Sequence, residues 1–538
     1  MSVKYTTASI LESDTIMPNS VPGVLWIYFQ NAILVTIPVS FILLVWYRHA
    51  VSRGMRTLSA EAGELTLDDG APRDPVRTSL DAAKQARLRL RLAVIYAVAG
   101  AVAAGVLTAL FFTMSVEFAA LRAFTVWYTF CWPILPTVAV LLALSRRRAF
   151  VAFLIYVAAG MVLVAGWTAF NKIVLGRTNV VALNNAMAFL TFLFQEAWLP
   201  YLVILVTGNR KLRSVSPLAL AGLLVFSYSA IGVNYAVVAL MDVRTAGNLL
   251  LVFGGANVQR IIFLLAALPV GLGCWLGLRL LGRGFERKSF SDVQLLVDTW
   301  WLIVIFNAAI LFSSDLGWGG LLCLLAFVAY RTVVEICFRL WRIPPAGEYD
   351  QRLLLLRVFG FQRRTEKLFD GIAQRWRFDG NVKVIAGADL VARLIDPGDF
   401  ITFVGGRLRQ QFVENSADLV RKLGSLDERR DPDGRFRVNE FFCRDNTWRP
   451  TLQALLKRSD VVLMDLRGFS ERNSGCQFEL QQLAANSLLA RTVFVVDDTT
   501  DSKLLEASLD GLGRIHLVHT KTQSAAETQA IYRALQTI

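Results

Sequence analysis

The feature that most constrains this chain is a series of long apolar stretches in its first two thirds. Each is close to the roughly 20 residues that a helix needs to cross the hydrocarbon core of a bilayer. They cover approximately 24–47, 92–114, 123–145, 149–170, 181–207, 216–241, 258–281, 293–312 and 318–338. We therefore predict an α-helical transmembrane bundle of about nine helices over residues 23–343. An extracytoplasmic segment, 1–22, would precede it.

The composition agrees with a membrane protein. Of the 538 residues, 55% are hydrophobic and 18% are charged, whereas soluble proteins average about 25% charged residues. The net charge of +14 would point to nucleic acid in a soluble chain, but here many basic residues fall in connections between apolar stretches. We therefore expect the lipid bilayer, and not nucleic acid, as a partner. The six cysteines form no CxxC pair and only three histidines are present, so no metal site is expected.

The basic residues also predict an orientation, because cytoplasmic loops retain Lys and Arg. The connections after the odd-numbered stretches are basic, whereas those after the even-numbered stretches carry few basic residues. The basic connections are 48–91, 146–148, 210–213, 279–288 and 339–342. We expect a multi-pass protein of the cell (inner) membrane with its N-terminus outside, a cytoplasmic loop over 48–91, and a cytoplasmic C-terminal region.

Two carboxylates inside the apolar stretches raise the possibility of transport, because ionisable residues within a membrane are functional candidates by default. Asp298 lies about one turn from the cytoplasmic end of its stretch, and Glu196 lies deep inside the fifth. The structural alternative for Glu196 is a pair with a buried amide, such as Asn184 or Asn234. The bundle is then either a transport pathway or an anchor and sensor.

Small residues gather in the second apolar stretch, between residues 100 and 105. Such a surface allows helix backbones to approach closely. It predicts close helix packing or self-association of the chain.

The pattern changes after Pro344 and Pro345. From 346 to 538, short β-rich runs alternate with amphipathic helices, which predicts a cytosolic α/β domain with a mostly parallel sheet. The expected strands are 353–359, 382–385, 436–442, 461–466, 492–496 and 515–518. Residues 389–435 look like an insertion, and we expect its polar turn, 427–435, to be a solvated loop.

The most informative stretch runs from Ser459 to Leu483. A buried strand ends in Asp465, a polar loop follows, and the next helix carries Glu479 near its start. In a parallel sheet the binding site forms outside the carboxyl ends of the strands. A carboxylate at such a position can attack or stabilise an oxocarbenium-like sugar carbon while its base departs. The alternative is an exposed acid that the helix dipole favours.

This stretch resembles the superfamily of Toll/interleukin-1 receptor (TIR) domains and nucleoside deoxyribosyltransferase-like enzymes. Cys476 and Glu479 match the Cys-x-x-Glu pair of the TIR helix. Asp465 before Leu466, Asn473, and Glu479 before Leu480 match the deoxyribosyltransferase-like pattern. The tryptophan that usually precedes the TIR cysteine is replaced by Gly475.

The resemblance spans about 350–538 and is most specific over 445–483. It implies a flavodoxin/TIR-like sheet with Glu479 as the catalytic carboxylate. The implied substrate-binding residues are Asp465, Asn473, Gly360, Phe361, Arg363 and Trp448. Asp465 serves equally as a strand-end cap and Trp448 as a core residue at a helix start, so both alternatives remain open. No metal and no cofactor are implied, and NAD is the candidate substrate.

The resulting expectation is a membrane-anchored, self-associating effector or signalling protein. Its cytosolic domain would bind a nucleotide and cleave the N-glycosidic bond of NAD, as an NAD glycohydrolase in bacterial defence or stress response. One alternative is a noncatalytic nucleotide-sensing or interaction scaffold. Another is a transporter or channel that the cytosolic domain gates. Phosphate-loop, GxGxxG and HExxH motifs are not found.

Overall fold

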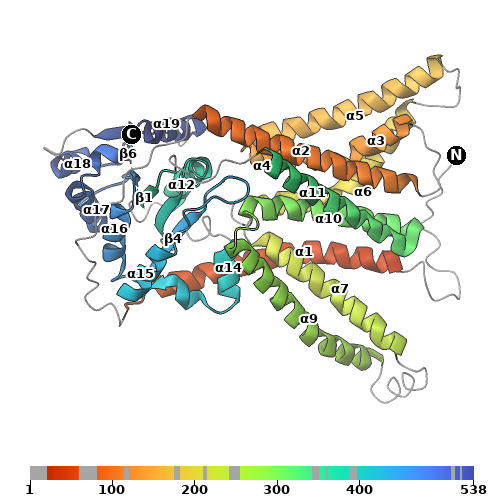
Figure 1. The fold of residues 1–538 in the computed structure, drawn as a ribbon, viewed down its shortest axis with the longest axis horizontal. Coiled ribbons are helices and arrows are strands. Elements are labelled where there is room, and N and C mark those ends of the chain that lie inside the picture. Colours follow the sequence, from red (N-terminus) through yellow and green to blue (C-terminus); the bar gives the residue numbers. More distant parts are fainter. Residues whose placement is uncertain are drawn as a thin grey trace.

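The chain folds into an elongated helical region and an α/β domain at one end of it (Figure 1). The computed structural model describes residues 21–59, 82–113, 120–174, 182–209, 212, 215–240, 255–341, 350–357, 362–386, 397–509, 515–521 and 524–538. The expected N-terminal segment, 1–22, lies almost wholly outside these residues.

Long helices make up the first region. They are α1 (Val21–Met55), α2 (Ala82–Phe112), α3 (Ala120–Phe130), α4 (Ile134–Leu141), α5 (Arg146–Val174), α6 (Ala182–Thr207), α7 (Ser216–Leu240), α9 (Gly255–Glu286), α10 (Asp292–Leu316), the 3₁₀ helix η1 (Gly317–Cys323) and α11 (Leu324–Leu340). Among the described residues, six helical stretches are long and apolar enough to cross a membrane. They lie in α1, α2, α5, α6, α10 and η1 with α11.

The expected count of nine crossings is not supported. The stretch 123–145 forms two helices, α3 and α4, that are bent by 41° at the break between them, and these add at most a seventh span. In α7 the described apolar part is the shorter helix Ser216–Ser229. Hydropathy does not reveal a break such as that between α3 and α4, which interrupts the continuous helix that a crossing needs. The stretches 216–241 and 258–281 lie mostly in the long helices α7 and α9, whose side chains are only partly among the described residues. The region is consistent with a multi-pass membrane protein.

The small residues of α2 pack inside the helical region. Ala103 and Ala104 are fully buried. A Cβ at Gly100 would lie 2.5 Å from the ring of Trp301, a buried residue of α10. Only glycine permits this approach, so the cluster serves close helix packing, as expected. Self-association of the chain remains a prediction.

The α/β domain contains one seven-stranded sheet in which every pairing is parallel. Its strands are β1 (Leu353–Arg357), β2 (Val382–Ala386), β3 (Phe412–Val413), β4 (Val438–Cys443), β5 (Val461–Asp465), β6 (Thr492–Val496) and β7 (His516–His519). The order is β3-β4-β2-β1-β5-β6-β7. This confirms the expected α/β domain with a parallel sheet.

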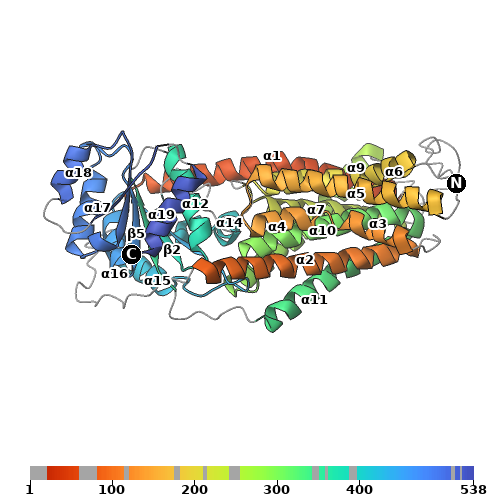
Figure 2. The same cartoon turned by 90° about the horizontal axis from the view of Figure 1, so that it is seen from above.

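Two layers of helices cover the sheet, because side chains of a strand alternate between its faces. Leu353 and Leu355 of β1 face α12 and α19, whereas Leu354 and Leu356 face the opposite layer. Figure 2 shows α12 and α19 on the side of the helical region, and α17 and α18 at the far end. The helices are α12 (Gln362–Trp376), α14 (Pro397–Val404), α15 (Ser416–Gly424), α16 (Trp448–Lys457), α17 (Ser474–Ala485), α18 (Ser502–Leu509) and α19 (Ala525–Gln536).

The segment expected as an insertion belongs to the sheet where it is described. It contains α14, the 3₁₀ helix η2 (Leu408–Gln411), the edge strand β3 and α15. Its turn over 427–435 was expected to be solvated, and this expectation is wrong. Asp431, Asp433 and Arg435 are all less than 5% exposed, because the turn packs against the helical region.

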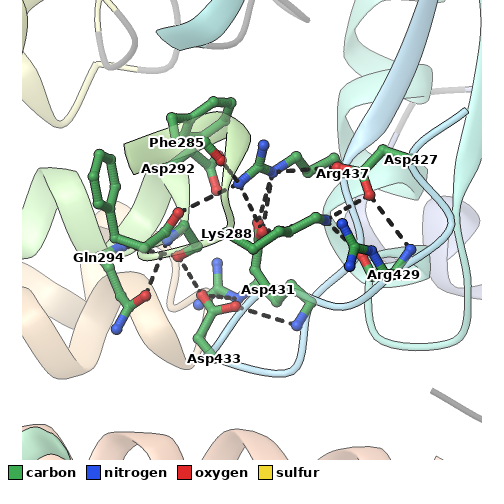
Figure 3. Close-up of polar contacts among 12 residues, drawn as sticks. Phe285, Lys288, Asp292, Gln294, Asp427, Arg429, Asp431, Asp433 and Arg437 are labelled. Carbon is green, nitrogen blue, oxygen red and sulfur yellow. Dashed lines mark hydrogen bonds and ion pairs between the residues drawn. The ribbon is translucent and has the colours of Figure 1, made fainter. Parts of the chain in front are cut away.

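Figure 3 shows the polar junction between this turn and the connection from α9 to α10. Ser291 donates to Asp433 over 2.6 Å and also caps α10. Lys288 lies 2.7 Å from Asp427. The Arg437 guanidinium stacks on Phe285, at 3.5 Å from its ring centroid. Charges that would otherwise be solvated are thereby paired across the two parts of the chain.

The junction continues at the first residue of α10. Both Nη atoms of Arg377 donate to the Asp292 carboxylate over 2.8 Å. Such a bidentate pair fixes direction as well as distance. The Arg377 side chain is 5% exposed and that of Asp292 is 11% exposed, so the pair is largely screened from water.

The end of α1 and the start of α2 make two further contacts with the domain. At the end of α1, a Cβ on Gly54 would lie 2.5 Å from the Phe412 ring, and Arg444 donates to the Gly54 carbonyl over 2.6 Å. At the start of α2, the Tyr532 hydroxyl donates to Gln85 of the helix. Among the described residues these contacts, together with the apolar packing of Ile401 and Phe403 of α14 on the helical region, hold the domain in place.

We predict that Asp292→Asn lowers the free energy of unfolding by about 3 kcal/mol, because it leaves Arg377 charged and buried without its anion. Chemical denaturation of the full-length protein in detergent measures the change. Asp418→Asn is the matched control, since Asp418 pairs with Arg421, whose side chain is 60% exposed. That pair is expected to contribute less than about 1 kcal/mol. Equal losses in both variants would contradict the importance of the junction.

Candidate functional site

The candidate site lies where the strand order of the sheet reverses. From β1 the chain moves to β2 on one side, and it later returns to β5 on the other side of β1. Connections on opposite sides leave a crevice at the carboxyl ends of the two central strands. In the register of β1 with β5, Arg357 lies opposite Asp465. The last residues of both strands are therefore placed at this reversal.

A tight turn follows β5 and fixes the loop. The Phe469 amide donates to the Leu466 carbonyl over 2.9 Å, and Gly468 adopts a φ of 74°. A residue with a side chain rarely adopts this conformation, so glycine is required here. The Phe469 ring is fully buried in the core beneath α17. The loop is thus anchored by its backbone and by an aromatic side chain.

Asp465 forms a buried, bidentate ion pair with Arg467. Nε and Nη2 of Arg467 each donate to one carboxylate oxygen over 2.7 Å. Asp465 is 1% exposed and Arg467 is 4% exposed. Both carboxylate oxygens are therefore engaged in holding the loop, in agreement with the alternative of a strand-end structural residue.

Asn473 also holds the loop in this structure. Its Oδ1 accepts hydrogen bonds from the main-chain N and the Oγ of Ser470, at 2.9 and 3.0 Å. Its main-chain carbonyl accepts from Cys476 and Gln477, and so begins α17. The side chain thus orders the turn that leads into the helix.

Glu479 lies in the second turn of α17 and is 3% exposed. It is therefore not an exposed acid at a helix start. Within the described part of the chain, its Oε2 has no hydrogen-bond partner. Burial raises the pKa of Glu479 to about 8, and the positive charge of Arg357 partly offsets this rise. The Glu479 carboxyl group therefore holds its proton at neutral pH, and a cation bound beside it would favour release of that proton.

Cys476 lies one turn before Glu479 and faces the end of β1. Its Sγ lies 3.5 Å from the Arg357 carbonyl oxygen, and the side chain is 1% exposed. The thiol packs in the core of the outer helix layer. Its contact ties α17 to β1 and thereby helps to position Glu479 beside Arg357.

Trp448 begins α16 and is half-buried. It packs edge-on against Phe478, with ring centroids 5.6 Å apart. A Cβ on Gly475 would lie 3.8 Å from the Trp448 ring. Trp448 of the neighbouring helix α16 thus lies against Gly475, the position at which the TIR pattern has a tryptophan. Its contacts agree with the core alternative.

Three of the expected residues are not placed. Gly360 and Phe361 lie outside the described residues, and Arg363 lies in α12 without a described side chain. The structure brings Asp465, Asn473 and Glu479 to one end of the sheet. Arg357 and Arg467 were missed by the sequence reasoning. The spacing Asp-x-Arg after a buried strand was the available signal for Arg467.

A separate groove of about 840 Å³ lies between α18 and β7. Asp497, Lys503 and His519 contribute to its lining. Neither Glu479 nor Arg357 lines it, so it is a different feature of the same sheet. Groups of three or more metal-ligating side chains are not found among the residues whose placement is described.

Comparison with known proteins adds no family assignment. No protein-family model, no curated protein and no solved structure matches the chain. The TIR-like resemblance therefore rests on the residues of 445–483 and on the parallel sheet.

We predict that Glu479→Gln stabilises the fold more at about pH 8 than at about pH 5. The pKa rises from 4.5 to about 8 on folding, so between these values the unfolded chain releases a proton that the folded chain retains. The stability that wild-type Glu479 contributes is complete below pH 4.5 and is lost as the pH rises through this window. A tenfold change in acidity corresponds to about 1.4 kcal/mol.

Relative to pH 5, a gain on the order of 3 kcal/mol in the stability of Glu479→Gln over wild type is expected at pH 8. The measurement is the thermal midpoint of the full-length protein at both pH values. Glu471→Gln is the control, because Glu471 is exposed in the loop before α17. A difference between Glu479→Gln and wild type that does not grow with pH would contradict the buried, protonated carboxyl.

Proposed function

We propose that this chain is a membrane-anchored effector or signalling protein whose α/β domain binds a nucleotide and cleaves its N-glycosidic bond. NAD is the first candidate substrate. The observation that carries the proposal is the buried Glu479 carboxyl, whose Oε2 has no partner among the described residues, at the strand reversal of a parallel sheet. The TIR-like pattern of 465–480 supports the same residue.

The chemistry requires Glu479 as a carboxylate. In NAD the bond between ribose C1′ and the nicotinamide nitrogen breaks, and the electron pair leaves with nicotinamide. The carboxylate stabilises the oxocarbenium-like carbon that results. Water then adds to C1′ and releases a proton to solvent. The positive charge of the bound nicotinamide ring favours the anionic form of Glu479, and so offsets the cost of its burial.

The neighbouring residues have supporting roles in this proposal. Arg357 lies at the end of β1, and its positive charge opposes the rise in the pKa of Glu479 and so favours the carboxylate form. The Asp465–Arg467 pair and the Asn473–Ser470 contacts keep the loop after β5 in one conformation. A rigid loop holds the carboxylate in a fixed position, which electrostatic catalysis requires.

We predict that the full-length protein in lipid bilayers releases nicotinamide from NAD, and that Glu479→Gln slows the release at least about 100-fold. Chromatography of the products measures the rate. Glu471→Gln is expected to retain wild-type turnover. A silent wild type at protein densities that permit self-association would contradict the proposed reaction.

The rate should also depend on pH in a defined direction. Since the pKa of Glu479 is about 8 and the carboxylate is the active form, kcat/KM is expected to rise about tenfold per pH unit below this value and to level off above it. Initial rates at low NAD concentration give the profile. A profile that falls with rising pH over the same range would assign Glu479 a different role.

The docked domain favours a second candidate, a noncatalytic nucleotide sensor that acts on the membrane helices. Contacts such as Arg377–Asp292 and Tyr532–Gln85 connect the domain directly to α10 and α2. A ligand that binds better to one arrangement of these contacts would shift the helices. Binding of NAD without turnover, measured by calorimetry and unchanged in Glu479→Gln, would favour this candidate.

A further inference from the structure

A second buried carboxylate lies inside the helical region. Glu196 is residue 12 of the 23-residue candidate span in α6 and is 2% exposed. Its described polar partner is Asn307 of α10, whose Nδ2 donates to Oε2 over 3.4 Å and to the Glu196 carbonyl over 3.3 Å. The amides expected as partners, Asn184 and Asn234, have no described side chains.

The charge of Glu196 is not balanced by a basic residue in the part of the chain that the structure describes. The other deep acid of the helical region differs, because Asp298 receives a 2.6 Å hydrogen bond from Arg331. A bare carboxylate in an apolar bundle is too costly to persist. Among the described residues Glu196 thus lacks a balancing positive charge, which a bound proton or metal cation would supply.

Asn307 presents its Nδ2 to Glu196, and a rotation of the amide by about 180° would turn its Oδ1 toward the carboxylate instead. It is fully buried, its amide points at Glu196, and its Oδ1 has no hydrogen-bond partner among the described residues. One carboxylate and one amide oxygen are too few for Ca²⁺ or Mg²⁺, which take six or more oxygen ligands. These two oxygen ligands suit a cation with a single positive charge.

Other titratable groups near α6 do not replace this cation. The buried thiol of Cys323, at the end of η1, interacts with Glu196 and carries no positive charge. On α3 and α5, the hydroxyls of Tyr128 and Tyr156 donate to each other's main-chain carbonyls. On α7, Tyr228 donates to the Leu25 carbonyl of the α1 helix.

We propose that Glu196 and Asn307 form a binding site for one monovalent cation, a proton or Na⁺, between α6 and α10. The site is independent of the proposed nucleotide chemistry. It lies on the helix whose first residue, Asp292, is clamped by Arg377 of the α/β domain. Both the cation site and the contact with the α/β domain thus involve residues of α10.

The test compares the thermal midpoints of full-length wild type and Glu196→Gln at low and high pH. Each is measured in sodium chloride and in choline chloride of equal ionic strength. A bound cation stabilises the folded state. In choline chloride, raising the pH is expected to lower the thermal midpoint of wild type by at least about 2 °C more than that of Glu196→Gln.

Measurements in sodium chloride distinguish a bound proton from a bound Na⁺ by the difference in thermal midpoint between wild type and Glu196→Gln. If the cation is a proton, the gap between wild type and Glu196→Gln at high pH is the same in both salts. If Na⁺ binds, sodium closes the gap. A gap that depends on neither pH nor sodium would overturn the proposal.

Two further variants protect the test against nonspecific effects. Glu335→Gln removes an acid of α11 whose side chain is 55% exposed beside Arg331, and it is expected to behave as wild type does. Asn307→Asp adds a second carboxylate at the site and should steepen the loss of stability on raising the pH in choline. An unchanged pH dependence in Asn307→Asp would also overturn the proposal.

Discussion

Charge pairing between the α9–α10 connection and the turn over 427–435 is the interaction on which the arrangement of the molecule depends. Most of these groups are buried, so each needs its partner more than a surface ion pair would. The pairing of Arg377 with Asp292 is bidentate and sets an orientation as well as a distance. It determines that the layer of α12 and α19 faces the helical region and that the layer with Glu479 faces away (Figure 2).

The sheet could be predicted from the sequence, and this junction could not. Strands such as 461–465 are short apolar runs between amphipathic helices, and that pattern is local. The turn over 427–435 has the composition of a solvated loop. Its partners lie far away in the chain, since Ser291 and Asp433 are 142 residues apart. Burial of such charges arises only when the two parts of the chain meet. Hydropathy likewise gave nine apolar stretches, but not the break between α3 and α4.

The candidate site shows the same division. The succession of strand, loop and helix that brings Asp465 and Glu479 together is visible in the sequence. The proximity of Arg357 follows from the register of β1 with β5, which no local pattern specifies. Similarly, Glu196 is recognisable as a polar residue in an apolar stretch, but its partner Asn307 lies 111 residues further on. Sequence reasoning thus finds the acids and misses the groups that determine their protonation.

The length of α1 has a mechanical consequence. Its 35 residues correspond to about 52 Å of helix, whereas the hydrocarbon core of a bilayer is about 30 Å thick. The helix is therefore about 20 Å longer than the hydrocarbon core is thick, and it reaches the edge of the sheet, where Gly54 touches Phe412. This excess length of α1 acts mechanically as a lever on the sheet edge. A change of roughly 10° in the tilt of the helix, well inside the range that membrane helices show, would move that edge by about 3 Å.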